Sequence, residues 1–375
     1  MKGHLRRRGR ASWELKFDLG TDPATGKRLT RYHAIKGTRK QAEAEAVKII
    51  ASAETGQYVD ASRETVRTFV ERWLSNWAAG NTSNKTYTRY EQLLRKHVVA
   101  RIGDVLVQKL KPVHLQDVYA AMAREGLADR TRLHVHRVVH RMLRHAAQWG
   151  VVHQNAAALV DAPTVASKEI EILTPEQVRA VLATLRGKSI YVIAATALAT
   201  GMRRSELLAL RWQDVDLDGA KLRVEQSLEQ TKRGGLVFKA PKTRHGRRTI
   251  TLPPSTVTDL RTHWKTQQEG RLALGLGKAP EDSLVFAAWD GEPRSPNGLT
   301  KEWQSVMSKA KLKATLHSLR HTHASTLIAS GLDVLTISRR LGHGSPAITL
   351  SVYGHLFKTD DRAAQIMEAT FASTE

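Results

Sequence analysis

The stretch LGHGSPAITLSVYGH, residues 341–355, has the pattern of two helices joined by a tight turn. Gly342 stands where a helix C-cap is expected, and Ser345 followed by Pro346 is typical of the start of a new helix. Tyr353 would then lie on a short helix that returns toward His343. The stretch therefore predicts a helical region that brings a histidine and a tyrosine together.

The sequence around this stretch, residues 161–375, predicts a mixed domain in which helices dominate. Thr174, with Gln177 three residues later, has the capping-box pattern of a helix start, and residues 189–201 are apolar enough for a buried helix. Three short β-rich runs follow, over residues 221–230, 235–241 and 247–252. Turn residues separate these runs, so we expect a three-stranded antiparallel sheet.

Residues 61–160 predict a bundle of four helices, because apolar residues recur at intervals of three and four. The four segments cover residues 65–77, 87–99, 114–122 and 132–149. The last segment carries four histidines, His134, His136, His140 and His145. A metal site is one hypothesis for them, but no carboxylate accompanies them and a polar helix face explains them equally well.

Residues 1–60 predict a small sheet with one helix. Residues 12–20 and 28–35 alternate apolar and polar side chains on either side of a turn that contains Pro23, as in a β-hairpin. Thr38 and Gln41 then have the capping-box pattern, and the helix that they open is expected to stop near Gly56.

The predicted strands of this first module are rich in basic side chains: Arg6, Arg7, Arg8, Arg10, Lys27, Arg28 and Arg31. They form either a solvated rim or a sheet that presents arginines to a polyanion. The second interpretation is favoured because few acidic residues oppose this charge.

The composition of the whole chain also indicates a polyanionic partner. Its 375 residues include 59 Lys and Arg against 36 Asp and Glu, a net charge of +23. The charge is net +9 over residues 1–40, −3 over residues 41–62, +9 over residues 63–160 and +8 over residues 161–375. Three basic modules separated by one acidic spacer are therefore expected.

The absence of cysteine excludes disulfides, Cys-ligated zinc, iron–sulfur clusters and cysteine nucleophiles. The longest uncharged apolar run, residues 189–202, is shorter than the ~20 residues that a membrane-spanning helix needs. The basic N-terminus is not followed by the apolar stretch of a signal peptide. We therefore expect a soluble, cytoplasmic protein without a membrane partner.

Four short segments carry the candidate chemistry: TGMRRSELLALRW (residues 200–212), KAPKTRHGRRTITLP (residues 239–253), HSLRHTHAS (residues 317–325) and the stretch at 341–355. In this order they resemble the active-site segments of the tyrosine recombinases, the phage-type integrases. The resemblance implies that the helical bundle is a core-binding domain and that the β-rich module is an arm-binding domain, both for DNA.

Two arginines fit the phosphate chemistry that this resemblance implies. A phosphodiester under attack carries charge on its non-bridging oxygens, and either divalent metals or fixed guanidinium groups can neutralise that charge. Arg203 and Arg320 are the candidates, because the guanidinium fork matches two phosphate oxygens. Glu206, expected on the same helix face as Arg203, could hold that guanidinium in place.

Tyr353 is the candidate nucleophile, with a half-buried core tyrosine as the alternative interpretation. His317, three residues before Arg320 on a predicted helix, is the candidate general base. A zinc pair of His317 with His321 is the alternative, but the glutamate of the HExxH motif is absent. The resemblance places His343 at the family's second His/Trp position, which hydrogen-bonds the scissile phosphate.

The resemblance also implies a lysine acid on a turn between two strands, which protonates the leaving 5′-oxygen. Lys242 is the matching residue, and Lys239 is close enough in sequence to be the alternative. Because a 3′-phosphotyrosyl bond stores the energy of the cleaved bond, we expect that neither ATP nor a metal ion nor another cofactor is required.

These observations predict a multidomain α+β protein: a small β-rich arm-binding domain (1–60), a helical core-binding bundle (61–160) and a mainly helical catalytic domain with a small antiparallel sheet (161–375). The implied function is site-specific DNA recombination, which integrates and excises a mobile element such as a prophage. The implied partners are double-stranded DNA at core and arm sites, a homotetramer on that DNA, a host DNA-bending protein and an excisionase.

Two alternative functions remain. A type IB topoisomerase would use the same chemistry but would need no arm-binding module. A non-enzymatic DNA-binding regulator would share the basic charge but would have no use for the set of Arg, Lys, His and Tyr residues.

Overall fold

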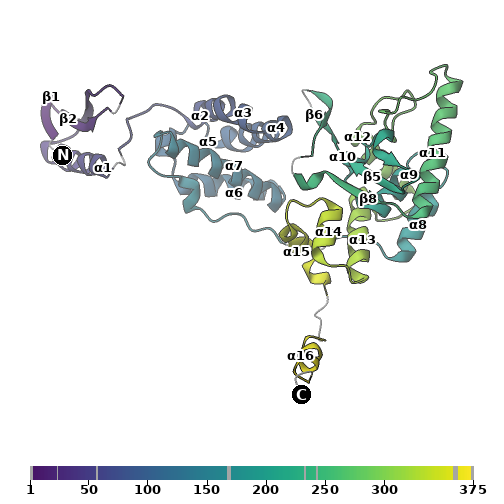
Figure 1. Cartoon of the computed structure of the whole chain (residues 1–375). Coiled ribbons are helices and arrows are strands. Elements are labelled where there is room, and N and C mark those ends of the chain that lie inside the picture. Colours follow the sequence, from purple (N-terminus) through teal and green to yellow (C-terminus); the bar gives the residue numbers. More distant parts are fainter. Residues whose placement is uncertain are drawn as a thin grey trace. The chain divides into compact units, whose positions relative to one another are not determined.

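The computed structural model describes residues 3–22, 24–55, 58–166, 170–231, 234–241, 244–357 and 362–372. The chain divides into two compact units, residues 1–167 and 168–375 (Figure 1). Within the first unit, the N-terminal sheet and the helical bundle have separate hydrophobic cores.

The chain begins with a three-stranded antiparallel sheet in the order β1 (Gly3–Gly9), β2 (Ser12–Thr21), β3 (Arg28–Lys36). The predicted hairpin is β2 and β3; β1 adds a third strand. Helix α1 (Arg39–Glu54) starts at the predicted capping box of Thr38 and Gln41. Alternation places Leu15, Phe17 and Ile35 on the sheet face that α1 covers with small apolar side chains. Pro23 and Gly56 lie outside the described residues.

The rest of the first unit is the predicted four-segment helical bundle. Its helices are α2 (Val66–Trp73), α3 (Ala79–Asn81), α4 (Asn84–Leu93), α5 (Ala100–Ile102), α6 (Pro112–Arg124) and α7 (Asp129–Gln148). π-Helical turns at Leu74–Ala78 and Leu94–Val99 join α2 to α3 and α4 to α5. Short 3₁₀ turns lie at Val107–Lys109 and Ala156–Leu159.

Two of the four histidines on α7 lie in the bundle core. His145 is buried and its Nδ1 accepts a hydrogen bond of 2.8 Å from the indole of Trp73. His136 is buried with its ring against Tyr119. The polar helix face that the sequence predicts is therefore wrong for these two residues, because ring packing buries them. Among the described residues, no group of three or more His, Cys, Asp or Glu side chains could hold a metal ion.

The second unit begins with α8 (Pro175–Leu185), which starts at the predicted capping box of Thr174 and Gln177, and the buried helix α9 (Tyr191–Thr200). It continues with these elements: α10 (Arg204–Leu207), β4 (Val215–Asp216), β5 (Lys221–Val224), β6 (Ser227–Thr231), β7 (Gly235–Lys239), β8 (Arg248–Thr251), α11 (Pro254–Ala273), α12 (Pro296–Lys309), α13 (Leu316–Ala329), α14 (Val334–Leu341), α15 (Pro346–Tyr353) and α16 (Arg362–Ala372). Further 3₁₀ turns lie at Trp212–Asp214, Arg244–Gly246 and Gly354–Leu356.

The predicted single sheet of three runs is wrong in its pairing. The first and third runs pair as β5 and β8, and β4 pairs with the opposite side of β5. Strands β6 and β7 form a separate hairpin. The first run divides after Val224, where Gln226 donates a hydrogen bond of 2.9 Å to the carbonyl of Ala209. At this point the chain lies beside the end of α10, and the following strand, β6, pairs with β7 instead of β8.

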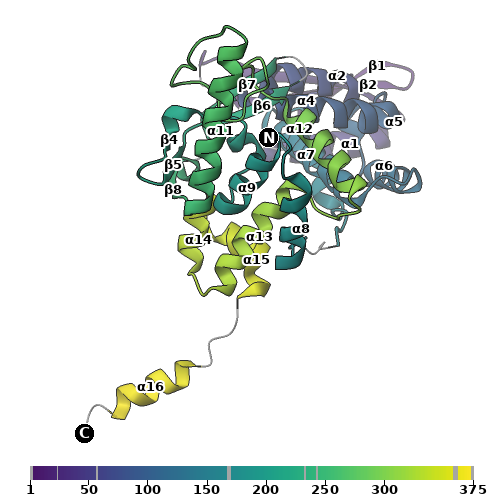
Figure 2. The same ribbon diagram turned by 90° about the vertical axis from the view of Figure 1, so that its right-hand side faces the viewer.

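Two apolar cores organise the second unit. The larger lies among α8 to α12 and the small sheets, and the buried indole of Trp303 belongs to it. The smaller joins α13, α14 and α15, which lie together in Figures 1 and 2. Among the described helices, none is both long and apolar enough to span a membrane.

Candidate active site

Helix α13 places His317, Arg320 and His321 on one face, as their spacing predicts. Arg320 is 3% exposed, and its guanidinium donates to the carbonyls of Gly201 and Leu341, the latter at 2.8 Å. These carbonyls lie at the C-terminal ends of α9 and α14, where the helix dipoles are negative. Burial and the nearby Arg203 lower the pKa of Arg320 to about 9, so its charge persists at neutral pH.

Arg203 lies immediately before α10, in extended backbone, and not on the helix as the sequence predicted. Glu206 nevertheless holds it as predicted: its carboxylate accepts from the Arg203 backbone at 3.0 Å and from Nη1 at 2.8 Å. The other guanidinium nitrogen donates to the carbonyl of Gly342 at 3.1 Å. Arg203 and Arg320 therefore both bind backbone carbonyls where α14 ends.

Arg248 on β8 is a member of this cluster that the sequence analysis missed. Its side chain is 6% exposed and donates to Glu206 at 2.8 Å and to the carbonyl of Arg340 at 2.7 Å. Arg248 belongs to the segment at 239–253 that resembles the family. Its contact with Glu206 joins residues 42 positions apart, and a single sequence does not reveal such a contact. Burial alone would raise the pKa of Glu206, but Arg248 and Arg203 outweigh it and the pKa is lowered.

Gly342 leaves room for this packing. It caps α14 in the left-handed region at φ +65°, and a Cβ there would lie 2.6 Å from Nη1 of Arg248. Only glycine suits both the conformation and the space. The glycine that the sequence marked as a helix end is also a site where the arginine cluster approaches the backbone.

His343 follows at once and is buried. Its Nδ1 lies 2.7 Å from the hydroxyl of Thr349, and its backbone N–H donates to the carbonyl of Ser338. Burial, followed by the charges of Arg320 and Arg203, lowers the pKa of His343 to about 4. The imidazole is therefore neutral at pH 7 and near both arginines.

Tyr353 ends α15, as predicted, but it is 1% exposed and so more deeply buried than the half-buried tyrosine of the alternative interpretation. Its hydroxyl lies 2.8 Å from Nδ1 of His321. Burial raises the pKa of Tyr353, and the charges of Arg320 and Arg203 oppose that rise, so the phenol lies within reach of their field. Within the described residues its hydrogen-bond partner is His321, and not His317.

Comparison with known proteins gives this cluster a family. The profile of the Phage integrase family matches residues 171–360, which include all four segments of the cluster. The chain belongs to the phage integrase family of tyrosine recombinases. The profile "Phage integrase, N-terminal SAM-like domain" matches residues 65–123 of the helical bundle in this recombinase.

Relatives support the assignment along almost the whole chain. The recombinase is 30% identical to an integrase of Streptomyces ambofaciens, over 92% of this chain and 89% of the relative. It is 25% identical to a tyrosine recombinase XerC-like protein of Caldanaerobacter subterraneus subsp. tengcongensis, over 93% of each.

Solved structures support the fold. A Tn1549 transposon integrase in complex with a circular intermediate DNA matches with a TM-score of 0.70 and 21% identity, over 82% of this chain and 99% of that chain. A lambda integrase dimer bound to a core site matches with a TM-score of 0.57 and 17% identity, over 96% of this chain and 95% of that chain.

The lysine of the predicted site is the one member that cannot be placed, because Lys242 lies outside the described residues. Lys239, the alternative, ends β7 and its ammonium pairs with Glu229 across the hairpin. Lys242 stays the residue that the resemblance predicts as the acid.

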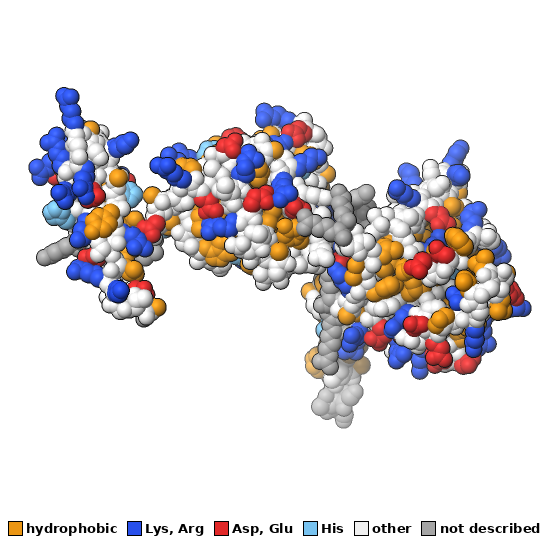
Figure 3. Space-filling model, turned by 90° about the horizontal axis from the view of Figure 1, so that it is seen from above, with side chains coloured by type: hydrophobic (Ala, Val, Ile, Leu, Met, Phe, Trp, Pro, Cys, Tyr) orange, Lys and Arg blue, Asp and Glu red, His pale blue; other side chains and the backbone are white. Residues whose placement is uncertain are grey.

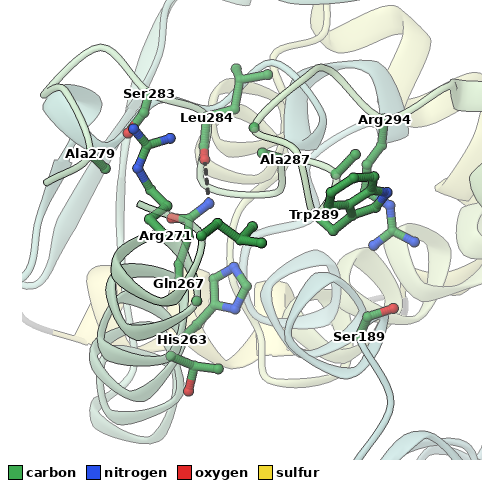
Figure 4. A pocket seen from close by; sticks show the side chains of 15 residues that line it. Ser189, His263, Gln267, Arg271, Ala279, Ser283, Leu284, Ala287, Trp289 and Arg294 are labelled. Atoms are coloured by element: carbon green, nitrogen blue, oxygen red, sulfur yellow. Dashed lines mark hydrogen bonds between the residues drawn. The ribbon is translucent and has the colours of Figure 1, made fainter. Parts of the chain in front are cut away.

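The same unit also contains a cavity of about 520 Å³ (Figure 4). It lies between α11 and the segment after it, with His263, Gln267, Trp289 and Arg294 in its walls. None of the predicted site residues that the structure describes lines it, so it is not part of the candidate active site.

Glu206→Gln should destabilise the second unit by on the order of 3 kcal/mol at pH 7, because it leaves the buried charge of Arg248 without a counter-charge. The lowered pKa means that the carboxylate contributes fully above the ordinary Glu pKa of about 4.3, and that this contribution is lost as the pH falls through the folded-state pKa. Chemical denaturation at several pH values should show the difference between wild type and variant shrinking in acid.

Glu176→Gln is the matched control, because Glu176 is an exposed carboxylate that pairs with Arg179 on α8. It should change stability by no more than about 0.5 kcal/mol. A Glu206→Gln protein as stable as this control at pH 7 would contradict the structural role of the Glu206 network.

Proposed function

We propose that this chain is a site-specific DNA recombinase that cleaves and rejoins DNA through a 3′-phosphotyrosyl intermediate, integrating and excising a mobile element such as a prophage. The observation that carries the proposal is the convergence of two held arginines, Arg203 and Arg320, on the environment of a buried tyrosine, Tyr353. Guanidinium groups held in this way are suited to a phosphodiester whose charge rises during attack.

In the proposed reaction, the phenolic oxygen of Tyr353 attacks phosphorus while Arg203 and Arg320 donate to the non-bridging oxygens. The proton of the phenol passes to His317, whose pKa is lowered by burial and by Arg320, so it is neutral and able to accept. His343 is proposed to donate from its Nε2, in the tautomer in which its Nδ1 accepts from the hydroxyl of Thr349.

The bond from phosphorus to the 5′-oxygen then breaks, and Lys242 supplies the proton that this oxygen needs. The products are a 3′-phosphotyrosyl link and a free 5′-hydroxyl. Because the link keeps the energy of the phosphodiester, the incoming 5′-hydroxyl of another strand can reverse the step without ATP or a metal ion.

The proposed division of labour follows the predicted domains: residues 1–60 bind arm sites, residues 61–160 bind the core site and residues 161–375 cleave. The N-terminal sheet supports the first assignment. Its strand register places Arg6, Lys16 and Tyr32 on the face opposite α1, and all three are exposed. Lys and Arg side chains gather over this region in Figure 3.

Strand exchange between two duplexes breaks four phosphodiester bonds, so four protomers are proposed to assemble on double-stranded DNA. A lambda integrase tetramer bound to a Holliday junction matches this chain with a TM-score of 0.56 and 17% identity. On α16, Ile366 and Met367 are 59% and 50% exposed, which fits the proposal that this helix docks on a neighbouring protomer. A host DNA-bending protein and an excisionase are proposed as further partners, acting with the recombinase on the DNA of the cytoplasm.

Tyr353→Phe should bind core-site DNA with the affinity of the wild type but form no covalent adduct, because only the attacking oxygen is lost. Denaturing gels of the protein mixed with DNA spanning the element's insertion junction measure the adduct. Tyr191→Phe, a hydroxyl deletion on α9, is the control and should form it normally. A covalent adduct with Tyr353→Phe would exclude this nucleophile.

Lys242→Ala should slow cleavage by about 10²- to 10⁴-fold, the usual contribution of a general acid. Replacing the leaving 5′-oxygen with sulfur should restore most of the rate, because a thiolate leaves without protonation. Lys239→Ala, which breaks the pair with Glu229, should not respond to the sulfur substitution. If sulfur rescues Lys239→Ala instead, the acid is the other lysine.

Arg6→Ala should weaken binding of arm-site DNA and reduce the slope of log affinity against log salt by about 1, the value for one lost phosphate contact. Lys48→Ala, which removes a basic side chain from α1, should change neither quantity.

Deletion of residues 1–60 should abolish arm binding and leave core-site cleavage intact. Arm binding that survives the deletion would contradict the proposed role of the first domain.

A further inference from the structure

The hydrogen bond between Tyr353 and His321 has no place in the reaction proposed above. The phenolic oxygen lies 2.8 Å from Nδ1 of His321, and the two rings meet at 63° with centroids 5.6 Å apart. His321 lies one helical turn after His317, and their rings are also in contact, with centroids 4.6 Å apart. His321 is thus the histidine between the nucleophile and the candidate base.

The side chains around Tyr353 are apolar, so the bond to His321 is the polar contact of its hydroxyl among the described residues. The ring is packed in the small core with apolar side chains of α13, α14 and the segment that follows α15: Ala324, Ile328, Ile337, Leu341, Leu356 and Phe357. A hydroxyl buried among such groups needs a partner, and loss of the partner costs about 1–3 kcal/mol. The apolar core fixes the ring, and His321 fixes the direction of the O–H bond.

The protonation states of the two groups and the tautomer of His321 set which group donates. Burial, then the charges of His317 and Arg320, lower the pKa of His321 to about 4, and burial raises the pKa of Tyr353 above its ordinary value. At neutral pH the imidazole is therefore uncharged and the phenol is protonated. In the tautomer that carries the imidazole proton on Nε2, the hydroxyl donates and Nδ1 accepts. Because the oxygen donates in this bond and does not accept, the bond occupies neither lone pair of the phenolic oxygen, and attack on phosphorus uses a lone pair.

We propose that His321 is a positioning residue for the nucleophile: by accepting the phenolic hydrogen bond at Nδ1, it sets the orientation of the Tyr353 oxygen before DNA is bound. This inference rests on the proposed cleavage by Tyr353. The proton balance of the proposed reaction is kept: for the transfer, the phenolic O–H turns from Nδ1 of His321 to His317, which takes up the proton, and the 5′-oxygen takes its proton from Lys242.

Three substitutions at His321 separate positioning from proton transfer and from packing. Alanine removes the acceptor. Asparagine places an amide oxygen near the position of Nδ1, so it can accept the same bond but cannot take up the proton. Glutamine carries the same amide nearer to the position of Nε2, and it is the matched control for asparagine.

The measured quantity is the rate of covalent adduct formation in a single turnover on nicked core-site DNA, with DNA affinity determined separately. We expect His321→Ala to slow adduct formation by on the order of 10- to 100-fold with unchanged affinity, as misplacement of a reacting group does. His321→Asn should recover most of this loss, and His321→Gln should not.

Several results would overturn the inference. An alanine variant as fast as the wild type would show that the bond does not matter, and a faster one would show that it restrains the nucleophile. Equal loss in the alanine and asparagine variants would show that the bond itself is not the cause. If the wild type forms no adduct at all, the proposed cleavage fails first.

A second measurement does not depend on activity or on the stability of these variants. In protein labelled with ¹⁵N-histidine, the Nδ1 resonance of His321, assigned with His321→Asn, should shift when Tyr353→Phe removes the donor. The remaining histidines outside the site, such as His145 of the bundle, should not shift. An unchanged His321 resonance would overturn the inference.

Discussion

The arrangement of the second unit depends on the buried carboxylate of Glu206, which binds the side chains of two arginines. Glu206 binds Arg203 through its backbone and guanidinium and binds Arg248 at 2.8 Å. Without it, three guanidinium groups, including that of Arg320, would share a region of low dielectric with no counter-charge. Such a cluster of like charges is unfavourable by several kcal/mol unless fixed acceptors compensate it.

The remaining compensation comes from backbone, and this explains why helix ends meet at the site. Where α9 and α14 end, Arg320 donates to the carbonyls of Gly201 and Leu341. Arg203 donates to the carbonyl of Gly342. Carbonyls at a helix C-terminus have no partner within their own helix, so they accept without cost to the fold. The guanidinium groups are thereby oriented by groups that cannot move independently of the helices, which is the preorganisation that electrostatic catalysis requires.

The sequence predicted those features that depend on residues close together in the chain, and it missed those that depend on distant residues. The starts of α1 and α8, the end of α14 and the face shared by His317 and Arg320 follow from residues within one helical turn, and all are confirmed. The splitting of the small sheets was missed, because the pairing of β5 with β8 and the contact of Gln226 with Ala209 join residues that are far apart in the sequence.

Two contacts of the site were missed for the same reason. Arg248 meets Glu206 across 42 residues, and His321 meets Tyr353 across 32 residues. Spacing rules give the faces of a helix but not what packs against them. The four segments could be recognised because each is local, whereas the contacts between the segments became visible only in the fold.

The arginines also determine the state of the histidines around them. Burial lowers the pKa values of His317, His321 and His343, and the charge of Arg320 lowers each of them further. At neutral pH the positive charge of the cluster is therefore carried by guanidinium groups, and the imidazoles are uncharged and can accept or donate a hydrogen bond.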